Sequence, residues 1–172
     1  MKPRFSLAKR KARELLQKAG VVAPPVPVAE LAGAAGAEVQ YEPFDGELSG
    51  MIMRRGRKTL IGINTKDPLG RQRFSLAHEL GHLLLHRSEA FHLDGKHPIR
   101  FRDARSSTGE DVDEVEANQF AAELLMPEAF LVRDVKEVAG EDAEVASRKL
   151  AERYQVSDQA MSIRLSVLGY LR

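Results

Sequence analysis

The sequence predicts an α+β fold in which a small three-stranded antiparallel sheet packs on a helical bundle. Three short β-type segments lie close together between residues 38 and 64. Most of the remaining chain has the apolar spacing of amphipathic helices. With 172 residues, of which 43% are hydrophobic, the chain has the size of one domain with a sizeable core. We therefore expect residues 1–172 to form a single domain.

The N-terminal region, residues 1–20, is expected to form an amphipathic helix that packs on the core. Its leucines and alanines share one face among many Lys and Arg residues, and Gly20 follows as a helix stop. A proline-rich connector then leads to a short Ala-rich helix over residues 28–35.

The predicted sheet spans residues 38–64, with strands at residues 38–42, 50–55 and 59–64. The basic run from Arg54 to Lys58 is expected to form a solvated turn between the last two strands. Asp67 is a suitable N-cap and Pro68 is favourable in a first helical turn, so the next helix is predicted to end near His86.

Residues 87–111 are polar and are predicted to form a long loop that contains a short strand at residues 99–102. A helix is expected over residues 112–126, because Pro127 stops it and can open another helix that continues to Val138. Two more helices, at residues 141–154 and 158–171, make a C-terminal helical pair in the region 141–172.

The composition excludes several classes of protein. The chain has no cysteine, which excludes disulfides and cysteine-rich zinc fingers. Its net charge of +1 is not typical of a nucleic-acid-binding or membrane-surface protein. No segment approaches the roughly 20 apolar residues that span a bilayer, and the N-terminus lacks the apolar run of a signal peptide. We expect a cytoplasmic protein with no membrane partner.

The segment His78-Glu79-Leu80-Gly81-His82 is the strongest indication of function. His78 and His82 are four residues apart on a predicted helix, so both imidazoles leave the same face and can bind one Zn²⁺ ion. Glu79 projects about 100° away around the helix. Zinc lowers the pKa of a bound water to about 7, and a nearby carboxylate can pass its proton to a leaving amine. Glu79 is therefore the candidate catalytic base.

Two neighbours of this motif carry further expectations. Gly81 costs about 1 kcal/mol relative to alanine in a helix interior, which indicates that another element approaches closely. His86 is one turn beyond His82 on the same face. It is too far along the helix for the same ion, so we expect it to contact the core or a substrate.

A catalytic zinc site needs a third protein ligand, and the helix at residues 112–126 offers Glu114 and Glu116. Glu116 belongs to a polar stripe that is expected to face water. That stripe consists of Asp113, Glu116, Gln119 and Glu123. Glu114 shares its face with Asn118 and with small and apolar residues, so it can approach the first helix. We favour Glu114 and keep Glu116 as the alternative ligand.

Asn118 lies one turn after Glu114. Its side-chain oxygen is expected to accept a ring N–H from His78 or His82 and so to select the tautomer that binds metal. The region 67–127 would thus hold both metal-binding helices and the loop between them.

Two segments, RFSLAHELGH at residues 73–82 and EVEANQFAAELLMP at residues 114–127, resemble the ImmA/IrrE family of bacterial metallopeptidases. The resemblance runs from about the first helix to the end of the chain and is strongest between residues 71 and 127. It implies a minimal gluzincin-like fold with one Zn²⁺ ion held by His78, His82 and Glu114, and with Glu79 as catalytic base.

The resemblance also implies a substrate class, because members of the family cleave or antagonise helix-turn-helix repressors. This releases genes of mobile elements, toxin–antitoxin-like pairs or stress responses. We expect the partner to be such a repressor, encoded nearby. An extended substrate segment can add to the edge of a sheet, and the third predicted strand is the candidate edge. The residues concerned are Thr59, Leu60, Ile61, Gly62 and Ile63.

Two other functions compete with proteolysis. The C-terminal helical pair resembles a helix-turn-helix, but its second helix offers only Arg164 and Arg172 as cations, so we do not expect direct DNA binding. A zinc protein that sequesters a repressor without cleaving it would have the same ligands. The motif is compatible with both.

Overall fold

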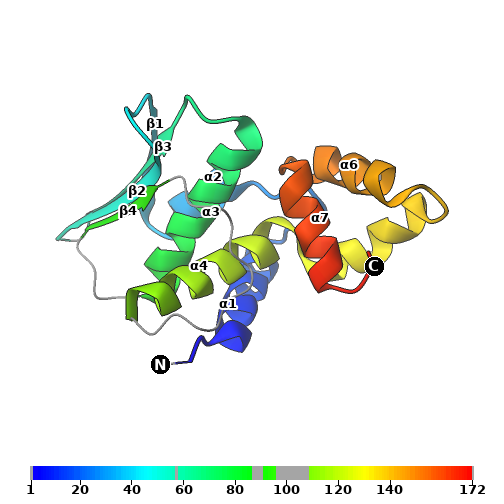
Figure 1. The fold of residues 1–172 in the computed structure, drawn as a ribbon. Coiled ribbons are helices and arrows are strands. Elements are labelled where there is room, and N and C mark those ends of the chain that lie inside the picture. Colours follow the sequence, from blue (N-terminus) through cyan, green and yellow to red (C-terminus); the bar gives the residue numbers. More distant parts are fainter. Residues whose placement is uncertain (1, 57, 87–90, 96–108, 172) are drawn as a thin grey trace.

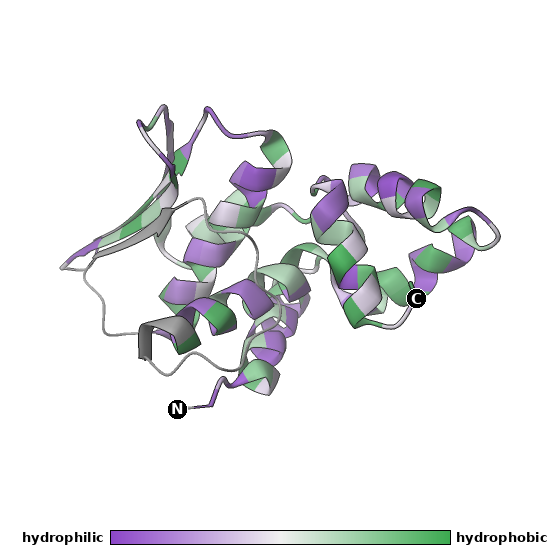
Figure 2. Cartoon of the chain, viewed as in Figure 1, coloured by the Kyte–Doolittle hydropathy of each residue, from purple (hydrophilic) through white to green (hydrophobic). Residues whose placement is uncertain are grey.

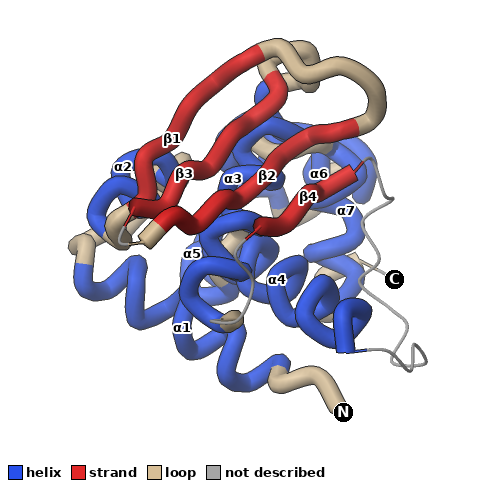
Figure 3. Tube along the Cα trace, turned by 90° about the vertical axis from the view of Figure 1, so that its left-hand side faces the viewer, coloured by secondary structure: helices blue, strands red, loops and turns tan. Residues whose placement is uncertain are grey.

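The computed structural model describes residues 2–56, 58–86, 91–95 and 109–171 (Figure 1). Helix α3 lies between the sheet and α4, and α1 packs against α4 (Figure 1). Helices α2 and α3 contact the sheet, whose strands cover them in the rotated view of Figure 3. Helices α6 and α7 gather at the end away from the sheet. This arrangement confirms the α+β class.

The elements follow the predicted order closely. Along the chain they are α1 (Phe5–Lys18), α2 (Val28–Ala34), β1 (Ala37–Glu42), β2 (Leu48–Arg55), β3 (Lys58–Asn64), α3 (Leu69–Leu85), β4 (Phe91–Gly95), α4 (Gly109–Leu125), α5 (Glu128–Asp134), the 3₁₀ turn η1 (Val135–Val138), α6 (Ala143–Tyr154) and α7 (Asp158–Val167).

The sheet differs from the prediction in the number of strands and in the direction of one. It is mixed and four-stranded in the order β1-β3-β2-β4, with β1 parallel to β3 and the other pairs antiparallel. The loop at residues 43–47 connects β1 to β2 across two strand spacings, about 9.6 Å. Strand β3 lies between these two strands. Buried Asn64 supports this loop by donating to the Leu48 carbonyl at 2.7 Å and accepting from the Phe44 amide at 3.1 Å.

The predicted substrate edge is wrong, because β3 is a central strand. Thr59, Leu60, Ile61, Gly62 and Ile63 pair with β1 on one side and with β2 on the other. Their backbone groups are therefore already engaged, and no further strand can add there. Among the strands that the structure describes, β1 and β4 end the sheet order.

Strand β4 lies within the segment that was predicted as a loop. The strand predicted at residues 99–102 falls outside the described residues.

The helix boundaries differ from the predictions by a few residues. Helix α3 begins at Leu69 after Pro68, whose extended ψ of 151° makes it the N-cap in place of Asp67. The predicted helix at residues 127–138 divides into α5 and η1. Helix α7 ends at Val167, four residues early, and Gly169 just beyond it has a left-handed φ of +80°.

The interior of the protein is centred on α3. Nine successive residues of this helix, Phe74–His82, are buried because the sheet covers one side and α4 the other. Helix α1 buries Ala8, Ala12 and Leu16, as its amphipathic pattern predicts. None of the described helices is long and apolar enough to cross a membrane, and Figure 2 shows hydrophilic residues on each of the longer ones.

Candidate metal centre

His78 and His82 lie one turn apart on α3 and point toward a common point. Their Nε2 atoms are 3.0 Å apart, and the two residues are only 2% and 3% exposed. The helical spacing predicted this shared face. Arg54 of β2 supports the end of the same helix, because its Nη2 donates to the carbonyls of His82 at 2.9 Å and His86 at 2.8 Å. The expectation that Arg54 belongs to a solvated turn is therefore wrong.

Glu114 comes from α4 and completes the group. Its Oε1 lies 3.0 Å from Nε2 of His82, and its Oε2 lies 3.2 Å from Nε2 of His78. The Glu114 side chain is 36% exposed. The group is therefore buried on the histidine side and accessible on the carboxylate side.

Gly81 allows α4 to come this close. A Cβ placed at Gly81 would lie 3.1 Å from Cα of Ala117 and 3.2 Å from Cδ1 of Phe120. The close approach predicted from a glycine in the middle of this helix is thus confirmed. A bulkier residue would separate the two helices that carry the group.

The three side chains fit a divalent metal ion. Metal–nitrogen and metal–oxygen bonds of about 2.0–2.2 Å in tetrahedral geometry place ligand atoms about 3.3 Å apart. The observed separations of 3.0–3.2 Å among the nitrogen and oxygen atoms are close to this value. Two imidazoles and a carboxylate are also the donor set of many catalytic metal sites.

The electrostatics of Glu114 favour its ionised form. Burial by itself raises the pKa of this carboxyl group, but hydrogen bonds with His78 and His82 outweigh burial and lower the pKa below its ordinary value. An ionised carboxylate is the form that binds a metal ion.

Asn118 meets the expectation placed on it, and the structure identifies its partner. Its Oδ1 lies 3.0 Å from Nδ1 of His78. An amide oxygen only accepts, so Nδ1 of His78 carries a proton, and Nε2 is the ring nitrogen left for a metal ion. Nε2 is directed at the common point with His82 and Glu114.

Glu79 is fully buried on α3 and faces the sheet at Gly50. A Cβ placed at Gly50 would lie 3.3 Å from Oε1 of Glu79 and 3.4 Å from Cβ of Ser75. Gly50 was not among the site residues predicted from the sequence. A glycine inside a strand often marks such a close approach, and this signal could have found it.

Glu116 does not join the His78 group, and its expected exposure to water is wrong. It is 1% exposed and accepts hydrogen bonds from Arg4 through the backbone N–H at 2.6 Å, Nε at 3.0 Å and Nη2 at 2.8 Å. His86 lies against the same carboxylate, with Nε2 3.1 Å from Oε2. Burial by itself raises the pKa of Glu116. Hydrogen bonds from Arg4 and His86 outweigh this effect and lower the pKa to about 2. Helical periodicity alone could not predict the burial of Glu116, because it does not show that α1 covers the polar stripe of α4.

The C-terminal helical pair also uses its charges internally. Arg164 is 1% exposed, donates to the Met126 carbonyl at 3.0 Å and pairs with buried Glu123. Arg164 is thus unavailable to a phosphate backbone, and Arg172 lies outside the described residues. Glu123 belongs to the stripe predicted to face water, and it is buried for the same reason as Glu116.

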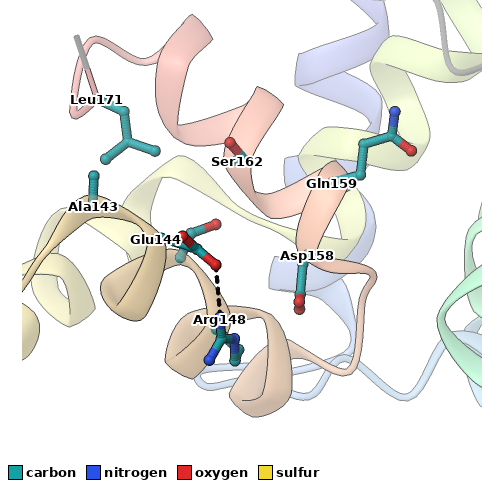
Figure 4. A pocket seen from close by; sticks show the side chains of 8 residues that line it. Ala143, Glu144, Arg148, Asp158, Gln159, Ser162 and Leu171 are labelled. Atoms are coloured by element: carbon teal, nitrogen blue, oxygen red, sulfur yellow. Dashed lines mark hydrogen bonds and ion pairs between the residues drawn. The ribbon is translucent and has the colours of Figure 1, made fainter.

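A pocket of about 370 Å³ lies between α6 and α7 (Figure 4). Its wall includes the exposed ion pair of Arg148 and Glu144 at 2.8 Å. It shares no residue with the candidate metal centre and is lined by no histidine. The chemistry of His78, His82 and Glu114 therefore does not extend to it.

Comparison with known proteins supports the resemblance seen in the two motifs. The family model described as the IrrE N-terminal-like domain of peptidase family M78 matches residues 32–166, more than three quarters of the chain. No curated protein matches the chain. The family supports a metallopeptidase kind of function, with which the group His78, His82 and Glu114 is compatible. The chain belongs to the family of IrrE N-terminal-like peptidase domains, M78.

Proposed function

We propose that this chain is a zinc-dependent endopeptidase that cleaves a helix-turn-helix transcriptional repressor. The observation that carries the proposal is the convergence of His78, His82 and Glu114, whose ligand atoms all lie within 4.8 Å of one another. Cysteine-free sites of this composition with one accessible side suit catalytic Zn²⁺.

In the proposed mechanism, His78, His82 and Glu114 would hold the ion. Bound zinc supplies Lewis-acid polarisation of a peptide carbonyl and a lowered water pKa. Glu79 accepts a proton at its carboxylate and then donates it to the leaving amine. The packing of Glu79 between α3 and β2 supports this role, because a buried carboxylate with close neighbours has few alternative positions.

The substrate follows from the family, because the motifs resemble ImmA/IrrE members that cleave or antagonise repressors. Cleavage of a repressor encoded near this gene would release mobile-element, toxin–antitoxin or stress-response genes. Arg164 is buried and paired with Glu123, which argues against the competing DNA-binding function. Repressor sequestration without cleavage remains the alternative that the experiment must separate.

The test compares the parent protein with Glu79→Gln on the repressor encoded nearby, with and without chelator. We expect the parent to cleave the repressor only in the chelator-free sample. Glu79→Gln should retain zinc but lose roughly 100-fold or more in cleavage rate, the usual contribution of a general base.

Glu152→Gln is the matched control, because Glu152 is exposed on α6 and away from the metal centre. It should cleave as the parent does. De-repression that persists in Glu79→Gln with zinc bound and no fragment formed would replace the endopeptidase proposal with sequestration.

A further inference from the structure

A second group of potential ligands lies beside the first. His86, Asp113 and Glu116 also bring ligand atoms within 4.8 Å of one another. Nε2 of His86 is 3.1 Å from Oε2 of Glu116 and 3.4 Å from Oδ1 of Asp113. From its position in the sequence, His86 was expected only to contact the core or a substrate.

This second group already has its cation, which argues against a second metal ion. Arg4 contacts both carboxylate oxygens of Glu116 through its side chain and also donates its backbone N–H. A metal ion at the same carboxylate would have to displace Arg4 or tolerate its positive charge. The buried Glu116 is instead held in one position, from which it can only accept hydrogen bonds.

The contacts from Glu116 to His82 form one line of hydrogen-bonding groups. Ionised Glu116 accepts, so Nε2 of His86 donates to it across 3.1 Å. Nδ1 of His86 lies 3.2 Å from Nδ1 of His82 and can accept a hydrogen bond from it. With its proton on Nδ1, His82 can bind a metal ion through Nε2. That atom lies beside Nε2 of His78 and Glu114.

The two histidines of the metal centre are thus oriented by different means. His78 needs one partner, Asn118, which lies on α4. His82 needs a chain of two side chains, His86 and Glu116, which Arg4 anchors from the residue just before α1. In both cases a terminal acceptor selects the Nδ1–H tautomer.

We propose that Glu116 and His86 are positioning residues, anchored by Arg4, that hold His82 in the tautomer able to bind the metal ion through Nε2. This inference rests on the proposed function for the identity of the metal. Its effect on metal affinity is measured separately from peptide cleavage, so the two proposals can fail independently. Partners of this kind typically contribute 10–100-fold to metal affinity.

The experiment uses the full chain with ¹⁵N-labelled histidine and the variants His86→Phe and His86→Gln. In the zinc-loaded parent, nitrogen chemical shifts should show His82 bound through Nε2 and protonated at Nδ1. His86→Phe removes the acceptor, so the Nδ1–H of His82 should exchange faster with solvent, and the zinc Kd in chelator competition should rise roughly 10–100-fold. His86→Gln provides an amide oxygen for His82 and an amide N–H for Glu116, so it should restore most of both properties.

Glu123→Gln is the matched structural control. Like Glu116, Glu123 is a buried carboxylate of α4 that pairs with an arginine of the N-terminal region, here Arg13 at 2.7 Å. Its ion-pair partners are Arg13 and Arg164 rather than a histidine, so its replacement should reduce stability without altering the His82 ring or the zinc Kd.

Two results would overturn this positioning role. One is parent-like zinc affinity with an unchanged His82 Nδ1–H signal in His86→Phe. The other is two zinc ions per parent chain with one lost in His86→Phe, which would make the second group a metal site. A parent that binds zinc with these properties but cleaves no repressor would refute the proposed function and leave the positioning role intact.

Discussion

At the scale of single residues, Gly50 sets the distance between β2 and the carboxylate of Glu79. A Cβ at position 50 would lie 3.3–3.4 Å from Oε1 and Cγ of Glu79 and from Cβ of Ser75. Both neighbours are buried, so neither can move into solvent. The position of the proposed base therefore depends on a residue that has no functional group of its own.

Gly50→Ala should lower the cleavage rate without lowering zinc affinity. The added methyl group would shift Glu79 by a few tenths of an ångström, and displacements of about 1 Å can cost 100-fold, so we expect a loss of roughly tenfold in kcat. The measurement is kcat alongside the zinc Kd. Unchanged kcat would mean that Glu79 tolerates the shift or does not act as the base.

At the scale of elements, the contact between α3 and α4 brings together the residues of the candidate metal centre. Each helix supplies ligands that are close in sequence, but the group forms only because Gly81 lets the helices approach at Ala117. A Cβ added at Gly81 would lie 3.1 Å from Cα and 3.3 Å from the carbonyl oxygen of Ala117, besides its contact with the Phe120 ring. These backbone atoms cannot rotate away as a side chain would.

Gly81→Ala should weaken both folding and metal binding. Alanine gains about 1 kcal/mol in helix propensity, but overpacking of a core typically costs about 1–3 kcal/mol. We expect a net loss of about 1 kcal/mol in the free energy of unfolding, with a raised zinc Kd because Glu114 moves away from the histidines. Denaturant unfolding and chelator competition measure the two effects.

Gly33→Ala in α2 is the matched control, since nothing lies within 4 Å of the added Cβ. It should stabilise the protein by up to about 1 kcal/mol. Equal stabilisation of both variants would contradict the close-packing argument.

At the scale of the whole molecule, buried carboxylates form ion pairs with arginines from distant parts of the chain. Glu116 and Glu123 lie on α4 and are paired with Arg4 and Arg13 from the N-terminal region. Glu123 is also paired with Arg164 from α7. Arg164 and Glu123 are both buried, and removing one member of such a pair typically costs about 3–5 kcal/mol. Helix α4 is thus held by charge on one side and by the metal centre on another.

Chelation should destabilise the parent protein, because an ion held by α3 and α4 binds only the folded chain. At a free zinc concentration 100 times the Kd, the stabilisation is about 2.7 kcal/mol, equivalent to roughly 5–10 °C in Tm for a chain of this size. Thermal unfolding with and without chelator measures it. Glu114→Gln should lose most of this difference, whereas Glu116→Gln should retain part of it; the reverse order would make Glu116 the ligand.

The sequence was sufficient for the shared face of His78 and His82, the helices and the first three strand segments, because each depends on local periodicity and on nearby glycine or proline. It was insufficient for strand β4, the order of the strands and the burial of Glu116, and it favoured Glu114 as the third ligand without excluding Glu116. Those features depend on which elements pack together. A helical period tells which residues of one helix share a face, but not which neighbour covers that face. Contacts such as Arg4 with Glu116, 112 residues apart, supply that information.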